Sequence, residues 1–239
     1  MMKIKACLTR LLTVLLLTYS CFSLSALTVD QTRYIFESNQ ESISIVVENT
    51  ARQTYGGQAW IENIQGTDTR PAFIVTPSFF KVPGESKQVL RVIKVLKTMP
   101  EDRESIFWVN LQEIPPANKE GGLSIALRTK VKLFYRPAGL VLGRKAAEEE
   151  LLLVKKSGNT ELANTTPYIF TITKLLDTQD RAIILDKQAQ SKLMMFTPGE
   201  SVILPMNSTV KSVMSIDDQG QVEQYFIDGF AQTTSVVRP

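Results

Sequence analysis

The sequence contains no histidine, and its only two cysteines, Cys7 and Cys21, lie close to the N-terminus. Without histidine, Ser-His-Asp and Cys-His catalysis, histidine proton transfer and histidine-containing zinc sites are excluded. No cluster of carboxylates, lysines or tyrosines stands out as a substitute. The sequence therefore indicates neither an enzyme nor a cofactor.

The N-terminal segment has the pattern of a secretory signal peptide, which we assign to residues 1–25. Basic residues precede the apolar run Leu11–Leu17, which is too short to span a bilayer, and small residues follow it. The pattern allows cleavage after Ser25 or after Ala26. A lipid-modified Cys21 is an alternative, but the residues before it lack the Leu and Ala/Gly of such processing sites.

Removing this segment changes the charge and cysteine content of the chain. Lys3, Lys5 and Arg10 account for the surplus of 27 basic over 24 acidic residues, so the mature chain is formally neutral. Nucleic-acid binding relies on a basic surplus and is not expected. We also expect no membrane insertion of the mature chain. It has no cysteine for a disulfide, so its core alone must stabilise it.

Short runs rich in Val, Ile, Phe and Thr, separated by turn residues, predict β-strands throughout the mature chain. Within one run, Ile43, Ile45 and Val47 alternate with Ser42, Ser44 and Val46, as in a strand with one buried face. The only stretch with a helical composition is Lys145–Glu150, which is more typical of a linker turn. The predicted strands are Ser42–Glu48, Gln58–Ile64, Val89–Leu96, Ile106–Ile114, Leu123–Tyr135, Tyr168–Leu175, Val210–Ile216 and Glu223–Phe230.

A weak internal repeat indicates two related domains. Phe80–Ser86 is echoed by Phe196–Ser201, each with a Pro-Gly turn, and Glu48–Ala51 is echoed by Leu162–Thr165. Proline ends a strand at Pro137, so we place the domains at residues 26–140 and 141–239. The fold class predicted is all-β, with two immunoglobulin-like β-sandwich domains.

The run Leu123–Tyr135 is too long for an ordinary strand. At roughly 3.3 Å per residue it would reach about 43 Å, whereas strands usually have about five or six residues. One interpretation is an exposed apolar edge that a partner covers. The other, a long core strand bent at a bulge, stays open. The apolar face consists of Leu123, Ile125, Leu127, Val131, Leu133 and Tyr135.

Several longer motifs follow one another in an order that is specific to one family. They are Asp30–Phe36, Gln58–Asn63, Asp102–Pro116 and Ile125–Pro137. Together they resemble the periplasmic chaperones of pilus (fimbrial) assembly, and the resemblance covers essentially the whole mature chain. It implies two sandwich domains in an L-shape with a cleft between them, and a periplasmic location. It also implies donor-strand complementation of pilus subunits and their delivery to an outer-membrane usher.

The resemblance assigns roles to particular residues. Arg33 and Lys132 would anchor the C-terminal carboxylate of a subunit, since two charge-assisted hydrogen bonds suit that group. The donor-strand residues would be Leu123, Ile125 and Leu127, each contributing roughly 1.5–3 kcal/mol when buried.

A charged trio, Glu104, Arg136 and Asp218, would tie the two domains together, with Asp217 as the alternative to Asp218. Only Ala117–Gly122 separate Pro116 from Leu123. That spacing resembles the short-loop branch of the family, which serves rod-like pili.

An alternative from another class is a structural or adhesive two-domain component of a surface fibre. Such a subunit is expected to carry a donor extension and usually a cysteine pair, both of which are missing here. The sequence identifies neither the cognate subunits nor the usher, and it leaves self-association of the free form open.

Overall fold

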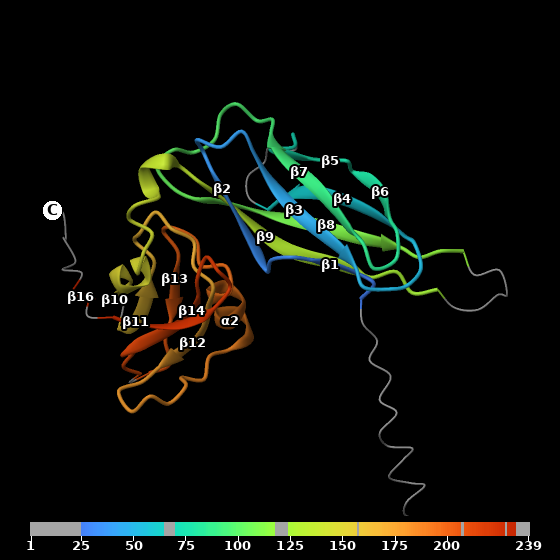
Figure 1. Ribbon diagram of the computed structural model, residues 1–239. Coiled ribbons are helices and arrows are strands. Elements are labelled where there is room, and N and C mark those ends of the chain that lie inside the picture. The colour runs from blue at the N-terminus through green and yellow to red at the C-terminus, as the bar shows by residue number, and fades with distance from the viewer. Residues whose placement is uncertain are drawn as a thin grey trace, which may run out of the picture.

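The computed structural model shows two β-rich lobes set at an angle to each other (Figure 1). The segment predicted to be a signal peptide lies outside the described residues except for Ser25. In the part of the chain that is described, no helix is long and apolar enough to cross a membrane. The described residues are 25–64, 70–117, 124–156, 158–206, 208–227 and 229–232.

The N-terminal lobe is a sandwich of a four-stranded and a five-stranded sheet. The strand orders are β1-β3-β7-β5 and β2-β9-β8-β4-β6. Between the sheets, the ring of Phe73 lies 5.0 Å from the rings of both Phe36 and Phe107. The strands are β1 Leu27–Val29, β2 Arg33–Glu37, β3 Ser42–Asn49, β4 Tyr55–Asn63, β5 Phe73–Thr76, β6 Phe79–Val82, β7 Lys87–Lys94, β8 Ser105–Ile114 and β9 Arg128–Arg136.

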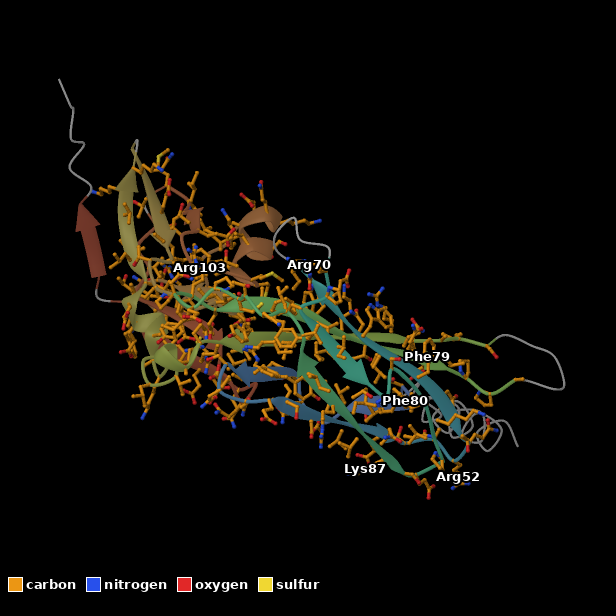
Figure 2. The ribbon with its side chains drawn as sticks, turned by 90° about the horizontal axis from the view of Figure 1, so that it is seen from above. Arg52, Arg70, Phe79, Phe80, Lys87 and Arg103 are labelled. Atoms are coloured by element: carbon orange, nitrogen blue, oxygen red, sulfur yellow. The ribbon has the colours of Figure 1, made fainter. Side chains whose placement is uncertain are left out.

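The alternation predicted for β3 is confirmed. Ile45 and Val47 are buried in this core and Ile43 packs against it. Figure 2 orients the lobe: Arg103 lies at the end that meets the C-terminal lobe, and Phe79 and Arg52 lie toward the other end.

The C-terminal lobe contains a four-stranded sheet, β13-β11-β10-β16, and a three-stranded sheet, β12-β14-β15. Its separate core includes the fully buried side chains of Leu162, Phe170 and Phe196. Both sandwich domains of the predicted fold class are therefore present. The elements are η1 Ala138–Leu140, η2 Ala147–Glu150, β10 Leu152–Lys156, β11 Asn159–Ala163, β12 Ile172–Leu176, α2 Lys187–Leu193, β13 Ser201–Ile203, β14 Ser212–Ile216, β15 Val222–Phe226 and β16 Gly229–Gln232.

The internal repeat corresponds to a shared structural device, a buried asparagine that holds a turn. Asn49 donates from Nδ2 to the carbonyls of Gln53 and Val82 at 2.8 and 2.9 Å. Asn164 donates in the same way to the carbonyls of Tyr168 and Phe196, at 2.8 and 2.9 Å. Each amide therefore satisfies backbone carbonyls at buried contacts, that of Val82 for Asn49 and those of Tyr168 and Phe196 for Asn164.

The Pro-Gly turns of the two copies need glycine for different reasons. Gly199 has a φ of +81°, a conformation that other residues rarely adopt. A Cβ at Gly84 would instead collide with the backbone of Arg52. Replacement of either glycine is therefore expected to disturb its turn.

Some expectations about secondary structure are wrong. Lys145–Glu150 is not the only helical stretch: it contains the 3₁₀ helix η2, but η1 and α2 are helical too. Asp186 caps α2, and its carboxylate accepts from Ala189 N at 2.8 Å. Glu223–Phe230 spans two strands, since β15 pairs with β14, whereas β16 pairs with β10 in the other sheet. The chain crosses between sheets there, which local composition does not reveal.

The two lobes meet at a small apolar cluster and a hollow. The cluster joins Ile106 and Phe134 of the N-terminal lobe to Ile169 of the C-terminal lobe. Beside it, a hollow of about 580 Å³ is lined by β2 residues and by the turn that contains Asp218. The outer face of the five-stranded sheet thus forms one wall of the space between the lobes.

Candidate functional site: two cations beside an uncovered strand

Arg33 and Lys132 lie directly opposite each other on adjacent strands. β2 pairs with β9 in parallel, and the register places Arg33 against Lys132. The next residues, Tyr34 and Leu133, point into the core of the lobe, so both cations point outward, toward the C-terminal lobe. The structure therefore brings the two residues together on one face.

The polar ends of both cations contact neutral groups of the C-terminal lobe. Arg33 Nη1 donates to the carbonyl of Ile216 at 2.7 Å, and Arg33 Nε is buried with no hydrogen-bond partner among the described residues. Lys132 Nζ donates to Thr171 Oγ1 at 2.8 Å and to the carbonyl of Met194. Within the described ranges, neither cation has a carboxylate at ion-pair distance.

This environment disfavours two positive charges. Burial, followed by the charge of Arg33, lowers the pKa of Lys132 to about 8. Burial also lowers the pKa of Arg33, although the carboxylates of Asp218 and Asp217 partly offset it. An anion placed between these cations would relieve both effects, because opposite charge favours the ionised form.

In the stretch that precedes Lys132, none of the described strands covers one edge of β9. β8 pairs with Arg128–Tyr135, whereas β2 begins to pair with β9 only at Lys132. Ile125 and Leu127 are 66% and 40% exposed, and Leu123 lies outside the described residues. β9 itself is nine residues long, shorter than the predicted Leu123–Tyr135 strand. The apolar alternation therefore continues beyond the strand into an exposed segment.

The predicted charged trio also meets between the lobes. Arg136 Nε lies 2.6 Å from Glu104 Oε1, and its Nη1 and Nη2 lie 2.6 and 3.0 Å from the Asp218 carboxylate. Glu104 also accepts from the backbone of Ile169 at 2.8 Å. Asp217, the alternative member of the trio, instead accepts from Gln221 N at 2.7 Å within its own turn.

The charge states of this trio follow from its contacts. Burial opposes the charge on Arg136, but the hydrogen bonds to Asp218 and the charge of Glu104 outweigh it and raise its pKa. For Asp218, burial acts to raise the pKa, and the hydrogen bonds from Arg136 outweigh it and lower the pKa. Two side-chain contacts of this trio therefore join the lobes: the ion pair of Arg136 with Asp218, and the hydrogen bond that Ile169 N donates to Glu104.

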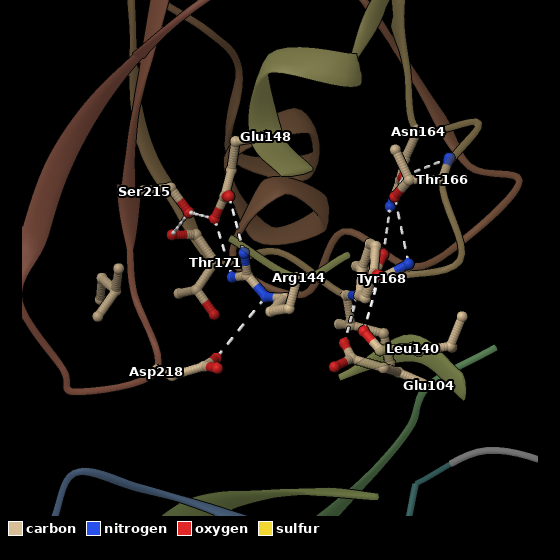
Figure 3. Close-up of polar contacts among 12 residues, drawn as sticks. Glu104, Leu140, Arg144, Glu148, Asn164, Thr166, Tyr168, Thr171, Ser215 and Asp218 are labelled. Carbon is tan, nitrogen blue, oxygen red and sulfur yellow. Dashed lines mark hydrogen bonds and ion pairs between the residues drawn. The ribbon is translucent and has the colours of Figure 1, made fainter. Parts of the chain in front are cut away.

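Sequence reasoning missed two further members of this network, Arg144 and Glu148. Their side chains form a two-pronged pair, with Arg144 Nη1 and Nη2 at 2.8 and 3.0 Å from the Glu148 carboxylate (Figure 3). Arg144 Nε lies 3.6 Å from Asp218 Oδ1. Their spacing of four residues was a visible signal, since such pairs face each other on a helix.

Known proteins resemble this chain in sequence and in overall fold. Residues 26–141 match the family model described as pili and flagellar-assembly chaperone, PapD N-terminal domain. The chain is 48% identical to the Escherichia coli chaperone protein FaeE over 217 residues, which cover 90% of this chain and 83% of FaeE. This chain belongs to the pilus-assembly chaperone family. The family is non-enzymatic and acts in pilus assembly.

Further relatives support the same assignment over both lobes. The Escherichia coli chaperone protein ClpE is 46% identical over 224 residues, which cover 92% of this pilus-assembly chaperone and 84% of ClpE. The crystal structure of the periplasmic chaperone SfaE superposes with a TM-score of 0.68 at 30% identity, covering 86% of this chain and 100% of SfaE. The two-lobed fold is therefore that of known chaperones.

Proposed function

We propose that this chaperone is exported to the periplasm, where it captures a pilus subunit on the uncovered edge of β9 and delivers it to an outer-membrane usher. The observation that carries the proposal is the pairing of Arg33 with Lys132 at the point where β2 stops covering β9. Membership of the family supports the role, and the exposed apolar residues beside that edge support the mode of binding.

The two cations anchor the C-terminal carboxylate of the subunit. Their present acceptors include the carbonyl of Ile216 and the hydroxyl of Thr171, which are neutral. A carboxylate offers charge-assisted hydrogen bonds, worth about 1.5–3 kcal/mol each, to the same donors. Only the end of a chain supplies a main-chain carboxylate, so this contact fixes the register of the added strand.

The apolar residues before the anchor then enter the subunit. Leu127 and Ile125 precede Lys132 by roughly 17 and 23 Å at 3.3 Å per residue in an extended chain. Both point to the same side of the strand, so they fill successive gaps in an incomplete sandwich. We expect Leu123 to fill the next gap, although it lies outside the described residues.

We also propose the division of the chain into an export signal and two domains. Residues 1–25 direct export and are removed, and residues 26–140 and 141–239 form the two domains. The first core cluster runs from Leu27 to Tyr135 and the second from Ala147 to Ile227, which supports this division. Self-association through the uncovered edge stays a prediction.

Co-expression with candidate subunits tests the proposal. Arg33→Ala and Lys132→Ala should each reduce the recovered complex by about tenfold, because one charge-assisted hydrogen bond is lost. Lys87→Ala is a matched control, since that lysine is exposed on the other sheet and pairs only at the surface with Glu48. If both cleft variants retain subunits as well as the unaltered chaperone, the anchor assignment is wrong.

A further inference from the structure

The Arg144–Glu148 pair is a buried ion pair in the segment that follows the last strand of the N-terminal domain. The Glu148 side chain is 0% exposed and that of Arg144 is 9% exposed. The guanidinium also lies 5.3 Å from the centre of the Phe170 ring, so it is enclosed on that side. Burying two charges is costly unless their partners are well placed. Because of this cost, the contacts of the Arg144–Glu148 pair point to a role in the second domain beyond local packing.

One end of the pair reaches the residues that hold the anchor cations. Ser215 Oγ lies 3.0 Å from Glu148 Oε1 and 3.4 Å from the carbonyl of Thr171 (Figure 3). Ser215 directly precedes Ile216, whose carbonyl accepts from Arg33, and Thr171 Oγ1 accepts from Lys132. The Glu148 carboxylate therefore holds Ser215 of β14, and through Ser215 it reaches Thr171, the residue that directly precedes β12.

The other end of the pair reaches the contact between the domains. Arg144 Nε lies 3.6 Å from Asp218 Oδ1, and Asp218 is held by Arg136 of the N-terminal domain. Arg136 in turn binds Glu104, which accepts from Ile169 N two residues before Thr171. The network thus leaves the C-terminal domain at Ile169 and returns to it at Thr171, within the segment that leads into β12.

The five charged residues of this network carry one excess negative charge, which the charge of Arg33 offsets. Glu104, Glu148 and Asp218 are acidic, whereas Arg136 and Arg144 are basic. The charges of Asp218, Asp217, Arg144 and Glu148 all act on the ionisation of Arg33. Arg33 is therefore linked to the Arg144–Glu148 pair in two ways, by the electrostatic effect of the pair on its ionisation and by the hydrogen bonds that run through Ser215 and Ile216.

We propose that Arg144 and Glu148 are positioning residues for subunit capture, which set the distance of Thr171 and Ile216 from the two anchor cations. This inference rests on the proposed function, since it assumes that Arg33 and Lys132 bind a chain-terminal carboxylate. The inference adds that the geometry of Arg33 and Lys132 depends on the Arg144–Glu148 pair, which acts through Ser215 and Asp218.

The test compares two synthetic strand peptides of alternating apolar and charged residues, one ending in a free carboxylate and the other amidated. Calorimetric titration of the mature chaperone gives the ratio of the two affinities. Glu148→Gln should lower this ratio by about tenfold, as expected when a hydrogen bond of a charged group is lost. Ser215→Ala, which removes only the hydroxyl link, should lower it by about threefold.

Controls separate positioning from folding. Glu149→Gln is the matched control, because Glu149 is the exposed neighbour of Glu148. The double variant Arg144→Met with Glu148→Leu removes both charges and keeps an apolar packing, a change that buried ion pairs often tolerate. It should melt close to the unaltered chaperone and still show the reduced ratio.

The outcomes distinguish this inference from the proposed function. If the unaltered chaperone binds both peptides equally, carboxylate anchoring fails, and the inference fails with it. If it prefers the free carboxylate, and Ser215→Ala and the folded double variant keep that preference, the positioning role alone is overturned. A ratio lowered in these variants and unchanged in Glu149→Gln supports it.

Discussion

Lys132 is the first residue of β9 that β2 covers, and its partner in the pairing is Arg33. The two cations therefore mark the boundary between the part of β9 that its own domain completes and the part that it leaves open. Their side chains are held by neutral groups of the C-terminal domain. The charge at this boundary is consequently available to an anionic partner.

Capture should weaken at high pH. The pKa of Lys132 is lowered to about 8, chiefly by burial, and a bound carboxylate would raise it again. Affinity for a free-carboxylate peptide should thus fall by about tenfold between about pH 7 and about pH 9. Lys132→Arg should remove most of this dependence, because arginine stays charged. A curve equally steep in that variant would show that another group titrates.

The stability of the free chaperone should increase as pH rises, whereas its affinity for the peptide should decrease. Because the pKa of Lys132 is lowered from 10.5 to about 8, the unfolded chain holds this proton more tightly in that window. The contribution of Lys132 to stability should therefore rise as pH increases from 8 toward 10.5. Urea unfolding of Lys132→Met should lack this rise relative to the unaltered chain.

A charge at position 125 should block capture without unfolding the chaperone. Ile125 is 66% exposed, so Ile125→Lys removes no core packing, but it loses the roughly 1.5–3 kcal/mol that burial in a subunit would supply. Val89→Lys, at an exposed apolar residue of β7, should leave capture unchanged. Loss of folding in Ile125→Lys would favour the alternative of a bent core strand.

Removing Arg136 alone from the charged trio should lower the free energy of unfolding by more than removing an exposed ion pair does. Arg136→Met leaves the carboxylate of Glu104 buried without its partner, and the cost should be about 3 kcal/mol in urea unfolding. Adding Glu104→Gln should recover much of this loss. Arg103→Ala, which breaks only an exposed pair with Asp102, should have no measurable effect. Equal losses in all three variants would contradict the prediction.

Asn164 should matter for stability despite its distance from the cations. Asn164→Ala removes hydrogen bonds to two carbonyls and to Thr166 N, all buried, so we expect a loss of about 2–3 kcal/mol. Asn159→Ala, at an exposed position of β11, serves as the control in the same thermal and urea measurements. A similar stability for both variants would rule out this role of the buried amide.

Periodicity predicted the parts of the fold in which one face of a strand is buried. In β3 the pattern identified Ile45 and Val47 correctly, because a strand alternates its faces strictly. The same rule failed at the start of β9, where alternation continues through Ile125 and Leu127 although pairing with β2 has not begun. The alternation of apolar side chains shows which face of a strand is buried, but it does not show where pairing with the neighbouring strand begins or ends.

The buried charges were harder to predict than the strands. Glu148 is the first of three consecutive glutamates, and the sequence does not show which of them turns inward. That depends on η2, whose short 3₁₀ turn buries Glu148 and leaves Glu149 and Glu150 exposed. The trio of Glu104, Arg136 and Asp218 was named from resemblance alone, because its members are far apart in the sequence.

The parallel pairing of β2 with β9 also imposes a steric limit. Any strand added to the open edge toward Lys132 meets the end of β2, which already occupies the next position along that edge. A chain that continued past this point would have to leave the sheet, whereas a chain that stops there fits. If a subunit strand binds this edge as proposed, the fold would select for chain ends by excluded volume as well as by charge, even at a pH where Lys132 is neutral.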